Sequence, residues 1–118
     1  MTEYKLGEIE MKFADIIWDN EPIGSGELAK LSEKTLKWKK STTYTILKRI
    51  CDRGLFKNEG GIVRSLVSKQ EFLSRQSTKF VEDTFAGSLP GYVVAFTSQR
   101  KLSDEEILEL KRIIENSR

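Results

Sequence analysis

The chain has 118 residues, 32% of them charged and 38% hydrophobic, which suits one compact domain or a small domain with an added assembly segment. It contains no histidine and one cysteine, which excludes an imidazole base, a metal site built from His or paired Cys ligands, and an internal disulfide. No apolar run approaches the length of a membrane span and the N-terminus has no signal-peptide core, so we expect a cytoplasmic protein without a cofactor, a metal or a membrane partner.

The first predicted helix covers residues 8–18. Apolar side chains recur there every three or four residues, as on a helix with one buried face; they are Ile9, Phe13, Ile16 and Ile17, with Met11, Ala14 and Trp18 beside them. Asp19-Asn20-Glu21-Pro22 then breaks the pattern, and Pro22-Ile23-Gly24 is expected to form a turn. Ser25 is a suitable N-cap for a short second helix over residues 26–32, with Leu28, Ala29 and Leu31 facing inward.

Residues 38–55, WKKSTTYTILKRICDRGL, predict a third helix with two different faces. The spacing of a buried stripe is found at Thr43, Leu47, Ile50 and Cys51, with Gly54 placed as a left-handed cap; we expect Cys51 to be a buried structural thiol. The other face is polar and carries Ser41, Thr42, Thr45, Lys48, Arg49 and Asp52. Short hydroxyl side chains let a helix approach base edges in the DNA major groove, and arginine can bind guanine or phosphate. The alternative is an ordinary solvated helix face.

Positive charge is concentrated around this helix. Between residues 30 and 57, nine lysines and arginines face two acids, a net charge of +7, so the rest of the chain carries −5. A polyanion such as DNA would select this distribution, because each neutralised phosphate releases condensed counterions, although a solvated basic face has the same composition. The expected DNA-contacting residues of this region are Lys39, Lys40, Ser41, Thr42, Thr45, Lys48 and Arg49.

After Gly54 the pattern changes from helical to extended. Two short runs, residues 55–59 and 62–67, flank Gly60-Gly61 and predict a β-hairpin. Three helices followed by a small hairpin form a winged helix-turn-helix, so we place a DNA-binding domain at residues 1–68. Lys57 and Arg64 on this wing are expected to reach the phosphate backbone or the minor groove, although an exposed hairpin with two cations is also common.

Residues 69–118 predict a helical segment that is too apolar to be a tail. We expect helices from residue 69 to about residue 85, from Pro90 through Phe96, and from Ser103, where Glu106 completes a capping box. Three helices of this size cannot bury their apolar residues alone, so a second copy of the chain is the simplest partner; folding back onto the wing is the alternative. The expected dimerisation residues are Phe80, Phe85, Tyr92, Val93, Phe96, Ile107, Leu110 and Ile114.

With these elements in this order, the sequence resembles the penicillinase and methicillin-resistance repressor family (BlaI and MecI type), to which the copper-responsive CopY repressors are related. The similarity covers nearly the whole chain and depends on the order and spacing of several short motifs rather than on a single one. The motifs are Glu10 with Ile16-Ile17-Trp18; Glu27-Leu28-Ala29; Trp38, Thr42, Thr43, Tyr44-Thr45, Leu47, Arg49 and Gly54; Leu66-Val67-Ser68-Lys69-Gln70-Glu71-Phe72; and Leu102-Ser103, Glu105-Glu106-Ile107 and Glu109-Leu110.

The resemblance implies a homodimeric winged-helix repressor, mainly α with a small β-wing, that binds a palindromic double-stranded DNA operator through its third helix and dimerises through its C-terminal helices. Repressors of this kind are inactivated when the signal of an inducing protease leads to a cut at an Asn-Phe bond. Alignment through Leu102-Ser103 places Ala95-Phe96 at that bond, where Phe96 matches and Ala95 does not. The cysteine cluster of the copper-responsive relatives is absent from the sequence, which excludes copper sensing on ligand number.

Three classes of function are compared. A DNA-binding repressor accounts for the local charge, the polar helix face and the apolar C-terminal helices together. A winged helix used only for protein contact accounts for the fold but leaves the +7 segment without a role. An enzyme needs a base together with a nucleophile or cofactor site, and the sequence shows no such combination. The sequence therefore favours the repressor.

Overall fold

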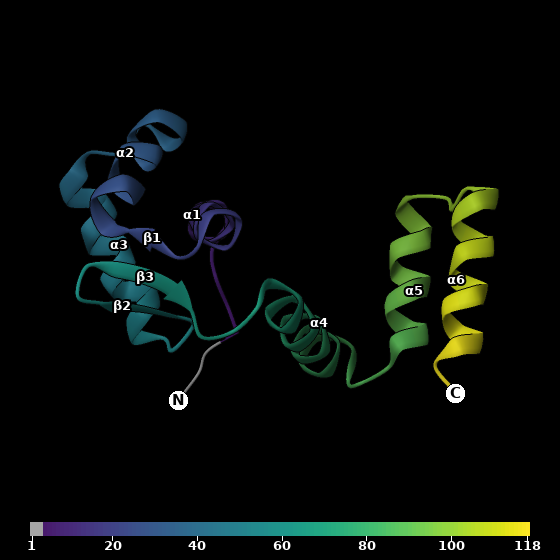
Figure 1. The fold of residues 1–118 in the computed structure, drawn as a ribbon. Helices are drawn as coiled ribbons and strands as arrows, with labels where there is room; N and C mark the ends of the chain where they lie inside the picture. Colours follow the sequence, from purple (N-terminus) through teal and green to yellow (C-terminus); the bar gives the residue numbers. More distant parts are fainter. Residues whose placement is uncertain (1–3) are drawn as a thin grey trace. The chain divides into compact units, whose positions relative to one another are not determined.

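The computed structural model describes residues 4–118 and is mainly helical, with one small sheet (Figure 1). Its helices are α1 (Glu8–Asn20), α2 (Ser25–Leu36), α3 (Lys40–Asp52), α4 (Lys69–Phe85), α5 (Leu89–Gln99) and α6 (Asp104–Asn116), and its strands are β1 (Ile23–Gly24), β2 (Phe56–Glu59) and β3 (Ile62–Ser65). The chain divides into two compact units, the first ending at Ser77 and the second covering Thr78–Arg118. The predicted fold class, a mainly α winged helix-turn-helix followed by further helices, is confirmed.

The sheet has three antiparallel strands in the order β1-β3-β2. The hairpin of β2 and β3 was predicted, and its turn depends on Gly60 and Gly61, whose φ angles of 59° and 83° are costly for residues with a Cβ atom. The prediction of a turn at Ile23 and Gly24 was wrong, because these residues form β1 and pair with Val63 and Ile62. Two residues are too few to produce an alternating pattern, so this strand exists only through its pairing with the hairpin.

Helix α2 is longer than predicted and continues to Leu36 rather than ending at Ser32. It ends at Lys37, which has a left-handed φ of 59° and whose amide donates to the carbonyl oxygen of Glu33 at 3.1 Å. The sequence does not indicate that the helix ends at this lysine, since glycine is the residue expected in a left-handed helix cap. The predicted N-cap is also displaced by one residue: Gly24 caps α2, and the amide of Ser25 donates to the carbonyl oxygen of Gly61 at 2.8 Å.

The core of the first unit lies between α1, α2, α3, the hairpin and the start of α4. Its largest fully buried residues are Phe13, Ile17, Leu28, Leu47, Ile50, Leu55, Phe56, Val63 and Phe72. Trp18 packs against Phe56 and Phe72, with ring centroids 5.2 and 5.6 Å away, and its indole N–H donates to the carbonyl oxygen of Val67 at 3.0 Å. Burial of Phe72 explains why this compact unit extends into α4, as far as Ser77.

Two predicted core positions differ in the structure. Ile9 is 50% exposed, because the buried stripe of α1 consists of Phe13, Ala14 and Ile17 and the first turn of the helix lies beyond it. Cys51 is half-buried rather than buried. Burial raises the pKa of its thiol, and the neighbouring Asp52 carboxylate raises it further, so the thiol stays protonated at neutral pH.

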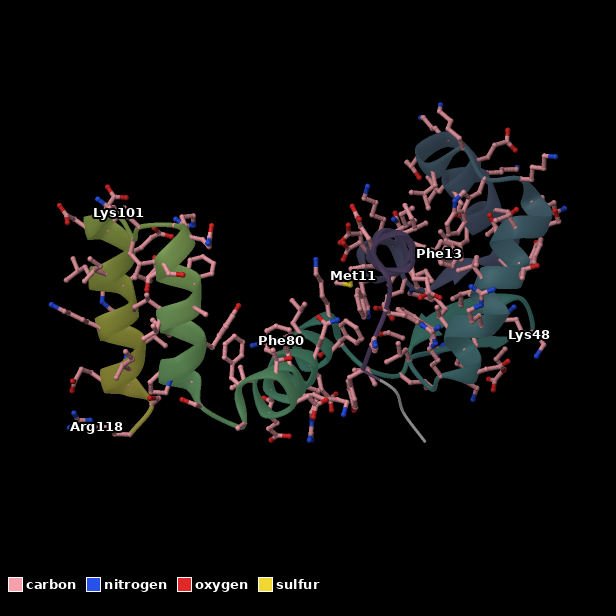
Figure 2. The ribbon with its side chains drawn as sticks, turned by 180° about the vertical axis from the view of Figure 1, so that it is seen from behind. Met11, Phe13, Lys48, Phe80, Lys101 and Arg118 are labelled. Atoms are coloured by element: carbon pink, nitrogen blue, oxygen red, sulfur yellow. The ribbon has the colours of Figure 1, made fainter. Side chains whose placement is uncertain are left out.

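In the second unit, α5 and α6 lie side by side as a hairpin (Figures 1 and 2). The capping box predicted at the start of α6 is present: the Glu106 amide donates to Ser103 Oγ at 3.1 Å and the Ser103 amide donates to Glu106 Oε1 at 2.9 Å. Neither helix contains a single buried residue. Among residues 4–118, none of the helices combines the length and apolar content that crossing a membrane requires.

Candidate nucleic-acid interface

Helix α3 has the two faces that its sequence predicts. Thr43, Leu47 and Ile50 are buried, and these three anchor the helix in the core. The polar set is exposed: Ser41, Thr42, Thr45, Lys48, Arg49 and Asp52. Lys48 projects away from the rest of its unit (Figure 2). A rigidly held helix with an open face of hydroxyls and cations can be placed against a polyanion without rearrangement of the core.

The hydroxyl groups of this face remain able to contact bases. Thr45 Oγ1 donates to the carbonyl oxygen of Ser41 at 3.0 Å, within the helix. That bond occupies the hydroxyl proton, whereas the Oγ1 lone pairs can still accept from a base amino group and the methyl group can contact a thymine methyl. Thr45 is therefore suited to a contact through its oxygen or its methyl group.

The N-terminus of α3 is positive. Lys39 is the N-cap and Lys40 the first helical residue, and the first turn contains no acid to offset the partial charge of the helix N-terminus. Lys40 Nζ lies 5.9 Å from the centre of the Tyr44 ring. Backbone amides and two lysines together form a surface that favours a phosphate group.

Two of the predicted cations already have acidic neighbours. Lys48 Nζ lies 3.2 Å from Asp52 Oδ2, and Lys57 Nζ on the wing lies 2.6 Å from Glu59 Oε2. The Lys57 ammonium also lowers the pKa of Glu59. Such exposed pairs are weak and screened by salt, so a phosphate can replace the carboxylate. Lys57 pairs directly with Arg64 across the hairpin, which puts both predicted wing cations at one level of the sheet.

Arg49 has a neighbour that sequence reasoning missed. The Glu10 carboxylate on α1 lies 3.9 Å from Arg49 Nη1 and 3.0 Å from Arg53 Nη1. Burial alone would raise the pKa of Glu10, but hydrogen bonds from the Gly7 amide and Arg53, with the charges of Arg53 and Arg49, lower it. The carboxylate is therefore ionised at neutral pH. Glu10 belongs to a family motif, but its contact with residues about forty positions away leaves no signal in one sequence.

The residues predicted for dimerisation form an open apolar surface on the second unit. Tyr92, Val93, Phe96 and Leu110 line a groove of about 340 Å³ between α5 and α6, together with Leu102 and Ile113. Phe80, Phe85 and Tyr92 form an aromatic cluster with centroid distances of 5.3 to 5.9 Å. Ile107 and Ile114 lie outside the groove and are 38% and 58% exposed. The structure thus separates the predicted residues that line the groove from Ile107 and Ile114, which do not.

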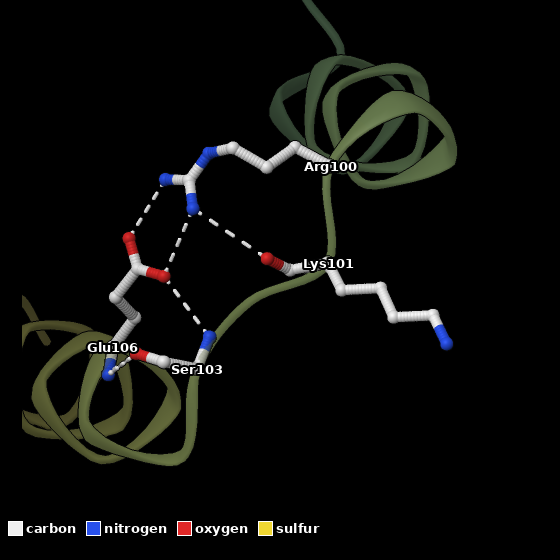
Figure 3. Close-up of polar contacts among 4 residues, drawn as sticks. All are labelled: Arg100, Lys101, Ser103 and Glu106. Atoms are coloured by element: carbon white, nitrogen blue, oxygen red, sulfur yellow. Dashed lines mark hydrogen bonds and ion pairs between the residues drawn. The ribbon is translucent and has the colours of Figure 1, made fainter.

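The link between α5 and α6 is held by one ion pair (Figure 3). Arg100 donates from Nη2 to Glu106 Oε2 at 2.8 Å and from Nη1 to Oε1 at 3.1 Å, a bidentate contact. Hydrogen bonds from Arg100 and from the Ser103 amide lower the pKa of Glu106 from its usual 4.5 to about 2. This pair ties the end of α5 to the first turn of α6.

The Glu106 pair predicts a specific acid dependence. Since folding lowers the pKa of Glu106, its contribution to stability is complete above pH 4.5 and is lost as the pH falls towards 2. In a side-chain carboxyl titration followed by NMR, Glu106 is expected to be half-protonated near pH 2, and Arg100→Gln is expected to raise that midpoint. A midpoint near 4.5 in the unaltered chain would show that the pair does not form in solution.

The chain is similar in sequence to known repressors along most of its length. The model of the penicillinase repressor family matches residues 6–116. The penicillinase repressor of Bacillus licheniformis is 27% identical over 115 residues, which cover 94% of this chain and 90% of the relative. The methicillin resistance regulatory protein MecI of Staphylococcus aureus is 24% identical over 115 residues, with 94% of each chain covered.

Proposed function

Because this chain belongs to the penicillinase repressor family, whose members are repressors of transcription rather than enzymes, we propose that it represses transcription by binding a palindromic DNA operator as a homodimer. The observation that carries the proposal is the exposed hydroxyl-and-cation face of α3, which lies on a helix anchored in the core and at the centre of the +7 segment. We assign DNA contact to residues 1–68 and assembly to residues 69–118.

In this proposal α3 enters the major groove. Ser41, Thr42, Thr45 and Arg49 face base edges, whereas Lys39, Lys40 and Lys48 contact phosphates beside them. Lys57 and Arg64 on the wing contact the neighbouring backbone. The division follows from chemistry: short hydroxyls and a forked guanidinium read hydrogen-bonding patterns, and flexible ammonium groups supply charge.

The homodimer is supported by the apolar surface of the second unit. Phe80, Leu89, Val94, Leu108, Ile113 and Ile114 are each 48% to 69% exposed on a unit whose two last helices bury nothing by themselves. Apolar side chains exposed to this extent within one unit mark an interface between chains. A second copy covers it by symmetry and brings two α3 helices to one operator.

We also propose that repression ends by a cut between Ala95 and Phe96. This bond lies within α5, so the helix must unwind before a protease can bind it. A cut there separates α6 from the rest of the chain and opens the dimer surface. After exposure of cells to a cell-wall antibiotic, mass spectrometry is expected to find fragments ending at Ala95; target genes expressed while the chain stays intact would contradict this.

The proposed function is tested by a gel-shift assay with the DNA upstream of the chain's own gene, repeated over a salt series. Specific binding that weakens steeply with salt is expected, because several phosphates are neutralised together. A winged helix used only for protein contact would bind neither this DNA nor a control duplex of the same length and composition. The outcome for the unaltered chain alone decides between the two functions.

The two lysines at the start of α3 are expected to contribute charge without sequence preference. Lys39→Ala with Lys40→Ala should lower affinity for operator and control duplex by the same factor, and should flatten the salt dependence by a slope of roughly one for each lost phosphate contact. The measurement is the same salt series. An unchanged slope would place both lysines in solvent, away from DNA.

A further inference from the structure

The strongest unexplained feature of the proposed interface is an acid beneath its arginine. Resting on the proposed function, we propose that Glu10 is a positioning residue for Arg49: it holds the guanidinium in place on α3 before DNA binds, and so contributes to the discrimination between operator and other DNA. An acid next to a DNA-binding helix would otherwise repel phosphate and lower affinity.

Glu10 is itself fixed by several contacts. Its side chain is 15% exposed, and Oε1 accepts hydrogen bonds from the Gly7 amide and from Arg53 Nη1, both at 3.0 Å. Arg53, 25% exposed, also donates to the carbonyl oxygen of Lys5 at 3.2 Å. These bonds join the start of α1 to the end of α3, so the carboxylate has one defined place relative to the reading face.

The second oxygen of the same carboxylate is directed to Arg49. Oε2 is buried and has no hydrogen-bond partner within residues 4–118, and Arg49 Nη1 lies 3.9 Å from it. That distance is too long for a hydrogen bond, so the contact is electrostatic and does not itself use the guanidinium donors. Arg49 remains 53% exposed, which keeps those donors available to a base or a phosphate.

The two arginines have different roles because they differ in exposure. Arg53 donates hydrogen bonds and secures the carboxylate, whereas Arg49, one helical turn earlier, interacts with Glu10 through charge alone. Restricting the rotamers of a long side chain in the free protein reduces the entropy lost on binding. This smaller entropy loss favours binding where the restrained position of the Arg49 side chain matches a base. Non-specific binding benefits little from it.

The test is a double-mutant cycle. Its readout is the affinity for the operator duplex found in the gel-shift assay, divided by the affinity for a scrambled duplex of equal composition. Glu10→Gln keeps an acceptor for Gly7 and Arg53 and removes the charge. We expect this ratio to fall roughly two- to fivefold per half-site, the range of an exposed ion pair. In the Arg49→Ala background, the same change is expected to leave the ratio unaltered.

Glu8→Gln is the matched control. Glu8 is an exposed acid in the same first turn of α1, and its substitution removes the same charge. It should leave the ratio unchanged. A ratio unchanged or raised by Glu10→Gln, or lowered equally in both Arg49 backgrounds, would overturn the inference; the latter would show that Glu10 only stabilises the fold. If the unaltered chain shows no preference for the operator, the proposed function itself fails.

Discussion

A chain that ends before Leu102 is expected to be monomeric and to bind its operator about 10² to 10⁴ times more weakly than the full chain. The deletion removes α6 and one wall of the apolar groove, including Leu110 and Ile113. Each winged unit would then bind its half-site independently. The loss comes from the missing link between two half-sites and not from any DNA contact, so affinity for a single half-site should be unchanged.

Sedimentation and gel shift with whole and half operators measure both effects. Leu110→Asp tests the same surface in a full-length chain, and Asn116→Asp adds the same charge at the polar end of α6 as its control. Circular dichroism is the check that the truncated and substituted chains stay folded. A truncated chain that still sediments as a dimer would show that α6 is not the main interface.

Arg49→Ala and Thr45→Ala should each weaken operator binding by about 1 to 3 kcal/mol per half-site. Arg49 is exposed on a helix whose opposite side is buried, so its removal is expected to cost more binding than folding free energy. Thr45→Ala removes an oxygen that can accept from a base and a methyl group that can contact thymine. The loss should be confined to operator DNA for Thr45 and should extend in part to other DNA for Arg49.

Binding isotherms on operator and scrambled duplexes separate these outcomes. Arg112→Ala on α6 is the matched control, since it removes the same side chain from an exposed position outside the proposed DNA-binding residues. Operator affinity equal to that of the unaltered chain in both α3 variants would show that DNA contacts another face.

Much of the fold could be predicted because strong local signals coincide with the tertiary structure. The buried stripe of α3, the Gly60-Gly61 turn and the Ser103 capping box each depend on residues close in sequence, and each is present. The start of α4 was also predicted at residue 69, and in the structure Ser68 Oγ accepts from the Glu71 amide there at 3.1 Å. In these elements, local preference and packing agree.

The elements that could not be predicted depend on distant residues. Strand β1 is defined by pairing with Val63, forty positions later, and the end of α2 depends on a lysine in a left-handed conformation. Helical spacing placed Ile9 on the buried stripe of α1 but could not show where the core ends.

The candidate site was predictable in composition but not in its contacts. The exposed residues of α3 follow from its periodicity, whereas the carboxylate behind Arg49 comes from α1 and is brought there by the packing of the two helices. The apolar C-terminal residues were likewise evident, but only the structure separates those that line the groove, such as Val93 and Leu110, from Ile107 and Ile114.

The most direct test of the account is a selection of binding sites from random-sequence duplexes by the full-length chain. A two-fold dimer carrying two α3 helices should enrich a palindrome, with half-sites about one helical turn, roughly 10 base pairs, or a multiple of it apart. Repeating the selection with Arg49→Ala should relax the same position in both half-sites. Enrichment of no sequence, or of a single asymmetric site, would contradict a dimeric repressor that reads DNA through α3.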